Sequence, residues 1–283
     1  MRESAIAALE RELFLEALRR RHGYDFTGYA KASLHRRLDQ LLLHSGREHL
    51  AELLPDLLRD PDMLPRVLSQ LSVPVTEMFR DPATFLALRN RVIPVLRTYP
   101  NINVWQTGCA TGEEVYSLAI LLAEEGLYDK TRIYATDIND SALERAEDGI
   151  IPLRHLRDYA ANYQAAGGSG SLADYFHVRY DFARLDEAIR SRIVFAHHNL
   201  VADGVFCEAH LILCRNILIY FEKPLQDKVL LLFRQSLVRG GFLCLGTRES
   251  LRFSSVAEDF ETIDADQRIY RSRLRLNGTG ASA

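Results

Sequence analysis

The fold is decided by the stretch Val104-Trp105-Gln106-Thr107-Gly108-Cys109-Ala110-Thr111-Gly112-Glu113-Glu114. It reads as a short apolar strand, a tight turn with two glycines four residues apart, and the start of a helix. Such a turn lets a ligand approach backbone N–H groups at a helix N-terminus. Alone it is weak evidence for a binding site, because purely structural turns of this kind are about as common.

The next strand strengthens the case for a ligand. Arg132–Asp137 ends in an acid 25 residues after Gly112, where a doubly wound fold holds a ribose diol. The turn lacks the full G-x-G-x-x-G pattern, and Glu113 and Glu114 would repel a pyrophosphate. We therefore expect a cofactor without phosphates and with a cationic end, for which S-adenosylmethionine qualifies. The alternative is that Asp137 only caps a helix that begins near Ser141.

Outward from this stretch, strands alternate with helices. Helical patterns cover Glu113–Glu125, Ser141–Glu147 (with Ser141 as a candidate cap) and Leu225–Leu237, and β-type runs cover Ile102–Trp105, Ile193–Phe195, Leu211–Leu213 and Gly241–Leu245. This alternation predicts an α/β fold with a doubly wound parallel sheet, closed by an edge strand at Arg268–Leu274. Residues 4–71 show only helical spacing of leucines and predict a small all-helical domain.

Composition excludes several classes of protein. A formal charge of −3 over 283 residues argues against a protein that coats nucleic acid. No apolar run approaches the roughly 20 residues of a membrane span, and acids near the N-terminus argue against a signal peptide. The four cysteines and nine histidines show no metal-ligand spacing. We expect a cytoplasmic protein with reduced thiols, non-catalytic histidines and no metal.

Three further segments carry a family resemblance. They are Thr76-Glu77-Met78-Phe79-Arg80-Asp81, Gly108–Ser117, and Leu213-Cys214-Arg215-Asn216-Ile217-Leu218-Ile219-Tyr220-Phe221. With Asn199-Leu200, Leu245–Ser250 and Lys31–Leu38, they resemble the chemotaxis receptor methyltransferases (the CheR family), which methylate glutamates of methyl-accepting chemotaxis proteins. The resemblance covers nearly the whole chain.

The resemblance implies a domain plan. It consists of an all-helical domain at residues 1–72, a linker with a Thr-x-x-Phe-Arg motif at 73–100, and a class I S-adenosylmethionine-dependent methyltransferase domain at 101–276. A small antiparallel β-subdomain is expected as an insertion at about 150–192, where Ala165–Ser171 is rich in glycine. Residues 277–283 are expected to form a disordered tail.

The resemblance also implies roles for single residues. Thr76, Arg80, Gly108, Glu113, Asp137, Asn199, Leu200, Arg215 and Asn216 would bind S-adenosylmethionine and its product S-adenosylhomocysteine, and Arg80 and Tyr220 would serve catalysis. Within this set, Glu113 would bind the methionine ammonium and Asp137 the ribose. Pro74 stands where many members have asparagine, which removes one polar contact to the cofactor. The alternatives are that Arg80 pairs with Asp81 or with a helix end, and that Tyr220 is only a packed aromatic.

A basic stretch in the helical domain suggests how the enzyme attracts its substrate. Residues 19–37 hold six Arg or Lys and one acid, in a chain that is acidic overall. Lys31, Arg36 and Arg37 would steer the enzyme onto glutamate-rich receptor helices, unless the run is only a solvated face. Asp39-Gln40 interrupts the basic run that many members continue. Whether the insertion also docks a receptor's C-terminal peptide stays open.

Two other functions remain at this point. One is a class I methyltransferase that acts on another signalling protein, and the other is a non-catalytic module that only binds the cofactor. The strand that ends in Arg215-Asn216-Ile217-Leu218 lacks the Pro-Pro-aromatic sequence typical of enzymes that methylate bases. A glutamate carboxylate is already ionised at pH 7, so methyl transfer to it needs no enzyme nucleophile.

Overall fold

The computed structural model describes residues 2–72 and 76–273, with side chains from residue 5 onward. Pro74 and the tail predicted at 277–283 lie outside the described residues. Within these ranges, no helix has both the length and the apolar character that crossing a membrane requires.

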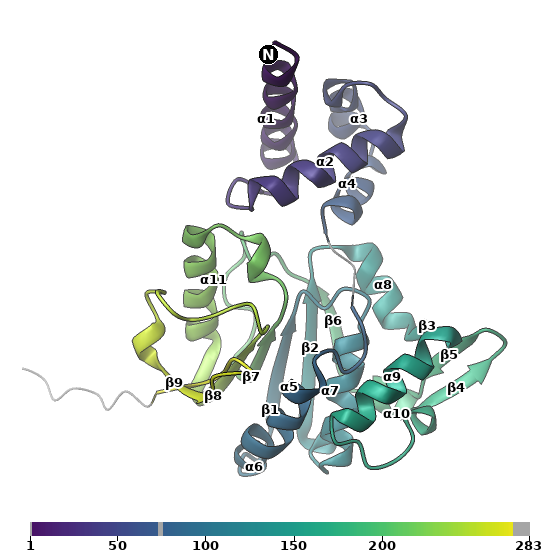
Figure 1. Ribbon diagram of the computed structural model, residues 1–283, viewed down its shortest axis with the longest axis vertical. Helices are drawn as coiled ribbons and strands as arrows, with labels where there is room; N and C mark the ends of the chain where they lie inside the picture. Colours follow the sequence, from purple (N-terminus) through teal and green to yellow (C-terminus); the bar gives the residue numbers. More distant parts are fainter. Residues whose placement is uncertain (1, 73–75, 274–283) are drawn as a thin grey trace, which may run out of the picture.

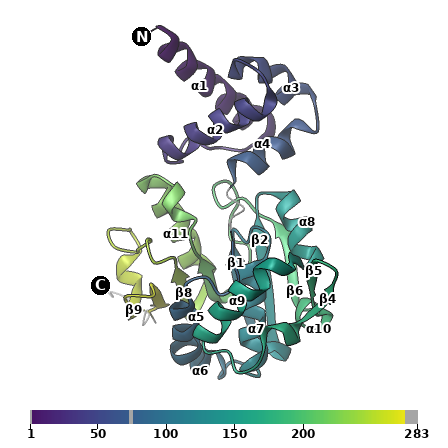
Figure 2. The ribbon, with the colours of Figure 1, turned by 45° about the vertical axis from the view of Figure 1, so that its right-hand side comes forward.

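The N-terminal part is all-helical and lies beyond one end of a central sheet (Figures 1 and 2). Its apolar core is formed by side chains at helical spacing, among them Phe14, Leu18, Leu34 and Leu38. Gly46 ends the second helix in the left-handed conformation that favours glycine. The elements are α1 (Arg2–His22), α2 (Lys31–Ser45), η1 (Leu50–Leu53), α3 (Leu54–Arg59) and α4 (Met63–Leu71).

The described residues form one seven-stranded sheet in the order β6-β2-β1-β7-β8-β10-β9. The first five strands are parallel, and β10 runs antiparallel between β8 and β9. The strands are β1 (Ile102–Thr107), β2 (Thr131–Asp137), β6 (Ile193–His197), β7 (Ala209–Cys214), β8 (Leu237–Leu245), β9 (Phe260–Asp264) and β10 (Ile269–Ser272). The strand predicted within Arg268–Leu274 is present as β10, but its predicted place at the edge of the sheet was wrong, because β9 pairs outside it.

Both faces of the sheet are buried, which explains the nearly continuous apolar runs of its central strands. In β1, Val104 joins the core beneath α7, whereas Trp105 joins the core beneath α11. The same alternation places Leu213 and Ile212 of β7 on opposite faces. The covering helices are α5 (Pro82–Ala87), η2 (Leu88–Val92), α6 (Ile93–Leu96), α7 (Glu113–Glu124), α8 (Asp140–Asp148), α9 (Leu153–Ala165), α10 (Glu187–Arg190) and α11 (Lys223–Ser236).

The segment between the two parts of the chain is itself packed into the larger one. Residues 82–96 are helical, and Phe85, Leu88, Val92 and Leu96 are buried in the core that contains β1. Among the described residues, 76–81 therefore precede this helical layer and pass the carboxyl end of β7, where the carbonyl of Arg80 accepts a hydrogen bond from Arg215.

An antiparallel three-stranded sheet follows α8, in the order β3-β5-β4. Its strands are β3 (Ile150–Pro152), β4 (Phe176–Arg179) and β5 (Phe182–Leu185). A 13-residue helix, α9, lies within the same insertion and was not predicted from the sequence. The antiparallel subdomain implied by the family resemblance is thus present.

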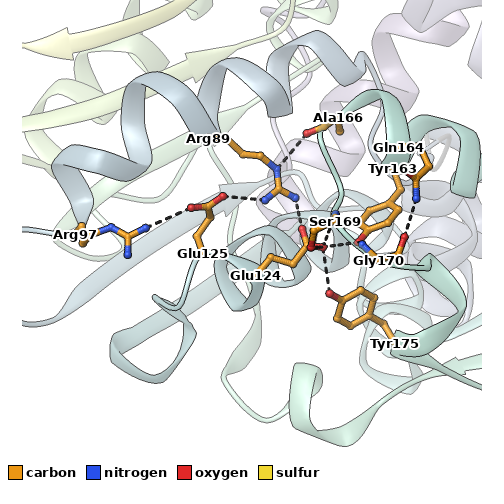
Figure 3. A network of polar contacts seen from close by, with 10 residues as sticks. All are labelled: Arg89, Arg97, Glu124, Glu125, Tyr163, Gln164, Ala166, Ser169, Gly170 and Tyr175. Carbon is orange, nitrogen blue, oxygen red and sulfur yellow. Dashed lines mark hydrogen bonds and ion pairs between the residues drawn. The ribbon is translucent and has the colours of Figure 1, made fainter.

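A buried network of polar contacts holds the insertion against α7 (Figure 3). The Glu124 carboxylate accepts hydrogen bonds from Arg89, from the Tyr163 hydroxyl and from the backbone and hydroxyl of Ser169. Arg89 also donates to the carbonyl of Ala166. Burial alone would raise the pKa of Glu124, but the bonds from Tyr163 and Arg89 outweigh it and lower that pKa. The network therefore fixes the glycine-rich loop Ala165–Ser171 against the C-terminal end of α7. This end of the helix is the one remote from the Gly108–Gly112 turn.

Candidate functional site

A cavity of about 380 Å³ lies between the helical part and the carboxyl ends of the parallel strands. Small-molecule sites typically measure roughly 300–1,000 Å³ and gather at this edge of open α/β sheets. The cavity is lined by most residues of the sequence-based prediction: Thr76, Arg80, Gly108, Asp137, Asn199, Leu200, Arg215, Asn216 and Tyr220. The helical part adds Phe26, Tyr29, Ser33, Leu34 and Arg37.

The turn after β1 needs its two glycines for steric reasons. Gly108 has a φ of +55°, and a Cβ there would lie 2.4 Å from Cδ1 of Ile217. Gly112 has a φ of +94°, and a Cβ there would lie 2.6 Å from the hydroxyl of Tyr116. The backbone of Gly108–Ala110 therefore lies open to the cavity at the start of α7.

Asp137 ends β2 and is 9% exposed. Its Oδ2 accepts the N–H of Ala110 at 2.9 Å and its Oδ1 accepts the N–H of Asn139 at 3.0 Å. Burial raises the pKa of this carboxyl, although those backbone bonds oppose the effect. A carboxylate offers about four acceptor positions, so both oxygens can still accept from a ligand hydroxyl.

The helix after Asp137 has its own cap. The side chain of Asn139 accepts the N–H of Ala142, and α8 begins at Asp140. The prediction of Ser141 as the capping residue was wrong, because the helix starts one residue earlier than its apolar pattern indicates.

Arg215 directly follows β7 and its side chain is fully buried. It donates to the Glu114 carboxylate at 2.5 Å, to the Asp81 carboxylate at 2.7 Å and to the carbonyl of Arg80 at 3.1 Å. Burial alone would lower the pKa of Arg215, but the carboxylates of Glu114 and Asp81 outweigh it and raise that pKa. Arg215 thereby ties β7 to α7 and to the segment that carries Arg80.

That segment holds Arg80 between two anchored neighbours. Phe79 is fully buried against Phe85 and donates its N–H to the hydroxyl of Ser117 at 2.8 Å. Asp81 pairs with Arg215, so the alternative in which Arg80 pairs with Asp81 is wrong. Phe79 and Asp81 both have φ above +50°, a conformation that costs a non-glycine residue roughly 1–2 kcal/mol. This backbone places Arg80 at the cavity wall.

Tyr220 is held by contacts to both parts of the chain. The Glu249 carboxylate accepts the N–H groups of Gly246, Asn216, Ile217 and Ile219 at 2.6–3.3 Å, which fixes the loop after β7. The carbonyl of Tyr220 accepts the N–H of Ala30 at 2.8 Å, next to the bridge between Tyr29 and Phe221.

Arg37 does not lie on the surface that the sequence suggested. It is 8% exposed and donates to the carbonyls of Leu71 at 2.8 Å and Ser72 at 2.6 Å. Its guanidinium lies 5.1 Å from the centre of the Tyr220 ring. The predicted steering role is therefore corrected for Arg37, because it faces the cavity with the apolar side of α2, whereas Lys31 and Arg36 are exposed.

The cavity wall also includes residues that the sequence-based prediction missed. Gln106, Glu114 and His198 line it, whereas the predicted Glu113 is not part of its wall and accepts a hydrogen bond from Thr111. Oε1 of Gln106, Nδ1 of His198 and Nε of Arg215 are buried without a protein partner. The groups at the wall that suit S-adenosylmethionine are the Asp137 carboxylate, which has acceptor positions left for ligand hydroxyls, and the open backbone of Gly108–Ala110.

Comparisons with known proteins agree with this arrangement. Residues 9–72 match the family model "CheR methyltransferase, all-alpha domain", and residues 74–269 match "CheR methyltransferase, SAM binding domain". The chain is 48% identical to the Pseudomonas putida protein named "Putative methyltransferase Cher3", over 93% of this chain and 96% of that one. It is 28% identical to the chemotaxis protein methyltransferase of Listeria innocua, over 84% of this chain and 88% of the relative.

Proposed function

This chain belongs to the CheR methyltransferase family, and from that premise we propose that it methylates glutamate side chains of chemoreceptors. The methyl donor is S-adenosylmethionine, and the product on the receptor is a glutamyl methyl ester. The substrate segments are the cytoplasmic helices of the receptor, so the enzyme acts in the cytoplasm.

One observation carries the choice of a carboxylate substrate. Arg37 projects from the helical part into the cavity and lies over Tyr220, which follows the β7 strand end beside the predicted cofactor residues. A guanidinium suits a carboxylate, because its planar N–H groups match the two oxygens. Burial lowers the pKa of Arg37, yet arginine stays charged at neutral pH.

The residues of the chain would act by binding and aligning the reactants. Bound S-adenosylmethionine supplies an electrophilic methyl group. A glutamate carboxylate is ionised at pH 7, so no side chain has to remove a proton from it. Arg37 and Arg80 would orient the carboxylate, and Tyr220 would flank the transferred methyl. Alignment of two bound reactants can lower a barrier by roughly 7–11 kcal/mol.

The cofactor would be held by the turn and by the strand ends. Asp137 would accept from the ribose hydroxyls, and Asn199 with Leu200 would flank the adenine. Glu114 lines the cavity but is bonded to Arg215 and to Gln106, so its charge is already compensated. Burial raises the pKa of Glu113, and a rotation of this side chain toward the cavity would be needed for it to bind the ammonium.

The direct test is methylation of receptor-rich membranes with radiolabelled S-adenosylmethionine. Methyl groups that are released by base identify the ester. Adjacent arginines give a matched pair of variants: Arg37→Ala should abolish turnover, whereas Arg36→Ala should only raise the KM for receptor. Binding of S-adenosylhomocysteine and the melting temperature report whether Arg37→Ala is folded.

Other outcomes would contradict the proposal. Base-stable labelling would indicate an acceptor other than a carboxylate. Labelling of a different signalling protein, with receptors left unlabelled, would keep the methyltransferase activity but replace the substrate. Cofactor binding without transfer to any membrane or cytosolic protein would indicate a binding module.

A further inference from the structure

Beyond the cavity, one face of the methyltransferase part carries an exposed aromatic ring beside exposed cations. Phe253 lies in the loop after β8 and is 81% exposed. The guanidinium of Arg252 stacks over the Phe253 ring, 4.8 Å from the ring centre. Both residues line a shallow surface depression, and Lys223 lines it too. We define these three residues of the methyltransferase part, Lys223, Arg252 and Phe253, together with Lys31 at the start of α2, as the basic rim.

The basic rim adjoins the mouth of the cavity. Lys223 follows Glu222, whose N–H donates to the carbonyl of Gly28 at 2.8 Å. Lys31 follows Ala30, whose N–H donates to the carbonyl of Tyr220. The loop of Arg252 is anchored at Glu249, which binds the backbone beside Tyr220. The rim is thus connected through a few bonded residues to the segment of Tyr220.

The exposed ring is not explained by folding. Phe253 has a φ of +66°, which is unfavourable for a bulky side chain. A ring that remains in water contributes little apolar burial to the fold, and strained residues of this kind cluster at functional sites. The depression holds only about 10 Å³, far below the roughly 300 Å³ of a small-molecule site, so a surface contact is indicated.

We propose that the basic rim docks an acidic segment of the methyl-accepting protein, next to the glutamate that enters the cavity. This proposal rests on the proposed function, in which the substrate is a protein glutamate. The three cations outnumber the two acids beside them, Glu222 and the half-buried Asp227 of the same depression, whose carboxylate already accepts the N–H of Ser255, so the rim keeps a positive charge. Arginine and aromatic side chains often dominate the binding energy of interfaces.

A protein segment fits the rim better than the other polyanions. The chain carries a formal charge of −3, whereas nucleic-acid binding needs many phosphate contacts. Recognition of anionic lipids usually takes a cluster of about 4–8 basic residues. An acidic peptide with one apolar side chain that contacts Phe253 requires only the few cations and the single aromatic ring of the rim.

The test uses the soluble cytoplasmic fragment of a chemoreceptor as the probe. Its binding is measured by fluorescence anisotropy at low and high salt, and its methylation by initial rates. Arg252→Glu and Lys223→Glu should each raise Kd and KM about tenfold, and Phe253→Ala about fivefold, because tenfold corresponds to one lost contact of moderate strength. Values of kcat and the affinity for S-adenosylhomocysteine should stay unchanged.

Arg239→Glu is the matched control, because this exposed arginine lies near the opposite end of β8 from the rim. It should keep Kd and KM within about twofold of wild type, well below the tenfold effect that one lost contact gives. If the three rim variants also stay within that range, or if the wild type does not bind the fragment, the docking proposal is overturned. If the wild type binds the fragment without methylating it, the proposed function fails, and the titrations alone decide whether the rim is the docking surface. The docking proposal would also be overturned if the wild type bound anionic vesicles more strongly than the receptor fragment.

Discussion

Replacing Asp137 by alanine should weaken the binding of S-adenosylhomocysteine more than tenfold. The side chain is buried and accepts two backbone N–H groups from the loops that face the cofactor. Hydrogen bonds to a charged group contribute about 1.5–3 kcal/mol each, and tenfold corresponds to about 1.4 kcal/mol. Asp137→Asn should fare little better, because its single acceptor oxygen leaves an amide NH₂ facing one of the two N–H groups.

The assay has to separate two roles of this carboxylate, namely binding the ribose and fastening the Ala110 loop. We suggest calorimetric titration with S-adenosylhomocysteine and with its analogue that lacks the ribose 2′-hydroxyl. If Asp137 binds the diol, the wild type discriminates strongly between the two ligands and Asp137→Ala binds them almost equally. Asp140→Ala is the control, because this neighbouring carboxylate is exposed and pairs with His197 outside the cavity wall.

Two results would refute the reasoning about Asp137. A folded Asp137→Ala protein with wild-type affinity would show that neither role matters. A variant that loses affinity for both ligands by the same factor would show that the carboxylate only fastens the loop. Thermal melting identifies any loss of folding before either result is interpreted.

Further predictions concern pH, turnover and stability. Because burial raises the pKa of Asp137, affinity for S-adenosylhomocysteine should fall on acidification at a higher pH than an ordinary aspartate dictates, and Asp137→Asn should remove this dependence. Tyr220→Phe and Arg80→Ala should lower kcat at saturating cofactor; wild-type turnover in both would leave only a packing role. Glu249→Gln should lower kcat about tenfold with cofactor affinity changed less than threefold, since one amide oxygen cannot accept four N–H groups; a proportional loss of both would contradict a positioning role. Glu124→Gln should lower the free energy of unfolding by about 2–3 kcal/mol. Since the pKa of Glu124 is lowered in the fold, this difference should be complete above the unfolded value of 4.5 and vanish as the pH falls, which urea titrations at several pH values measure.

The sheet was predictable because its central strands are buried on both faces and read as apolar runs. The elements that failed are the less regular ones. The edge strand β9 carries the sequence Phe260-Glu261-Thr262-Ile263-Asp264, with two exposed positions, and gives no strong periodic signal. Helix α9 was missed because it lies in an insertion whose glycine-rich end suggested a loop.

Most of the cavity was predictable because its residues follow strand ends, and parallel strands bring their carboxyl ends together. Glu114 was missed because two adjacent glutamates at a helix start look equivalent in sequence. Their directions differ by about 100° on a helix, and the one that faces Arg215 depends on where β7 ends. The role of Arg215 as a buried tie between three segments likewise depends on contacts between residues more than 100 positions apart.

Arg37 did carry a signal in the sequence. It lies three residues after Leu34 and four before Leu41, on the apolar face of α2, whereas Arg36 is turned away from that face. A buried arginine needs partners for its charge and its N–H groups, and the partners are the carbonyls at the end of the helical part and the face of Tyr220. The same side chain therefore fixes where the chain leaves the helical part and, in the proposed function, would supply the cation that faces the reacting carboxylate. Arg37 thus contributes both to the contact between the helical part and the loop after β7 and to the positive charge at the cavity wall.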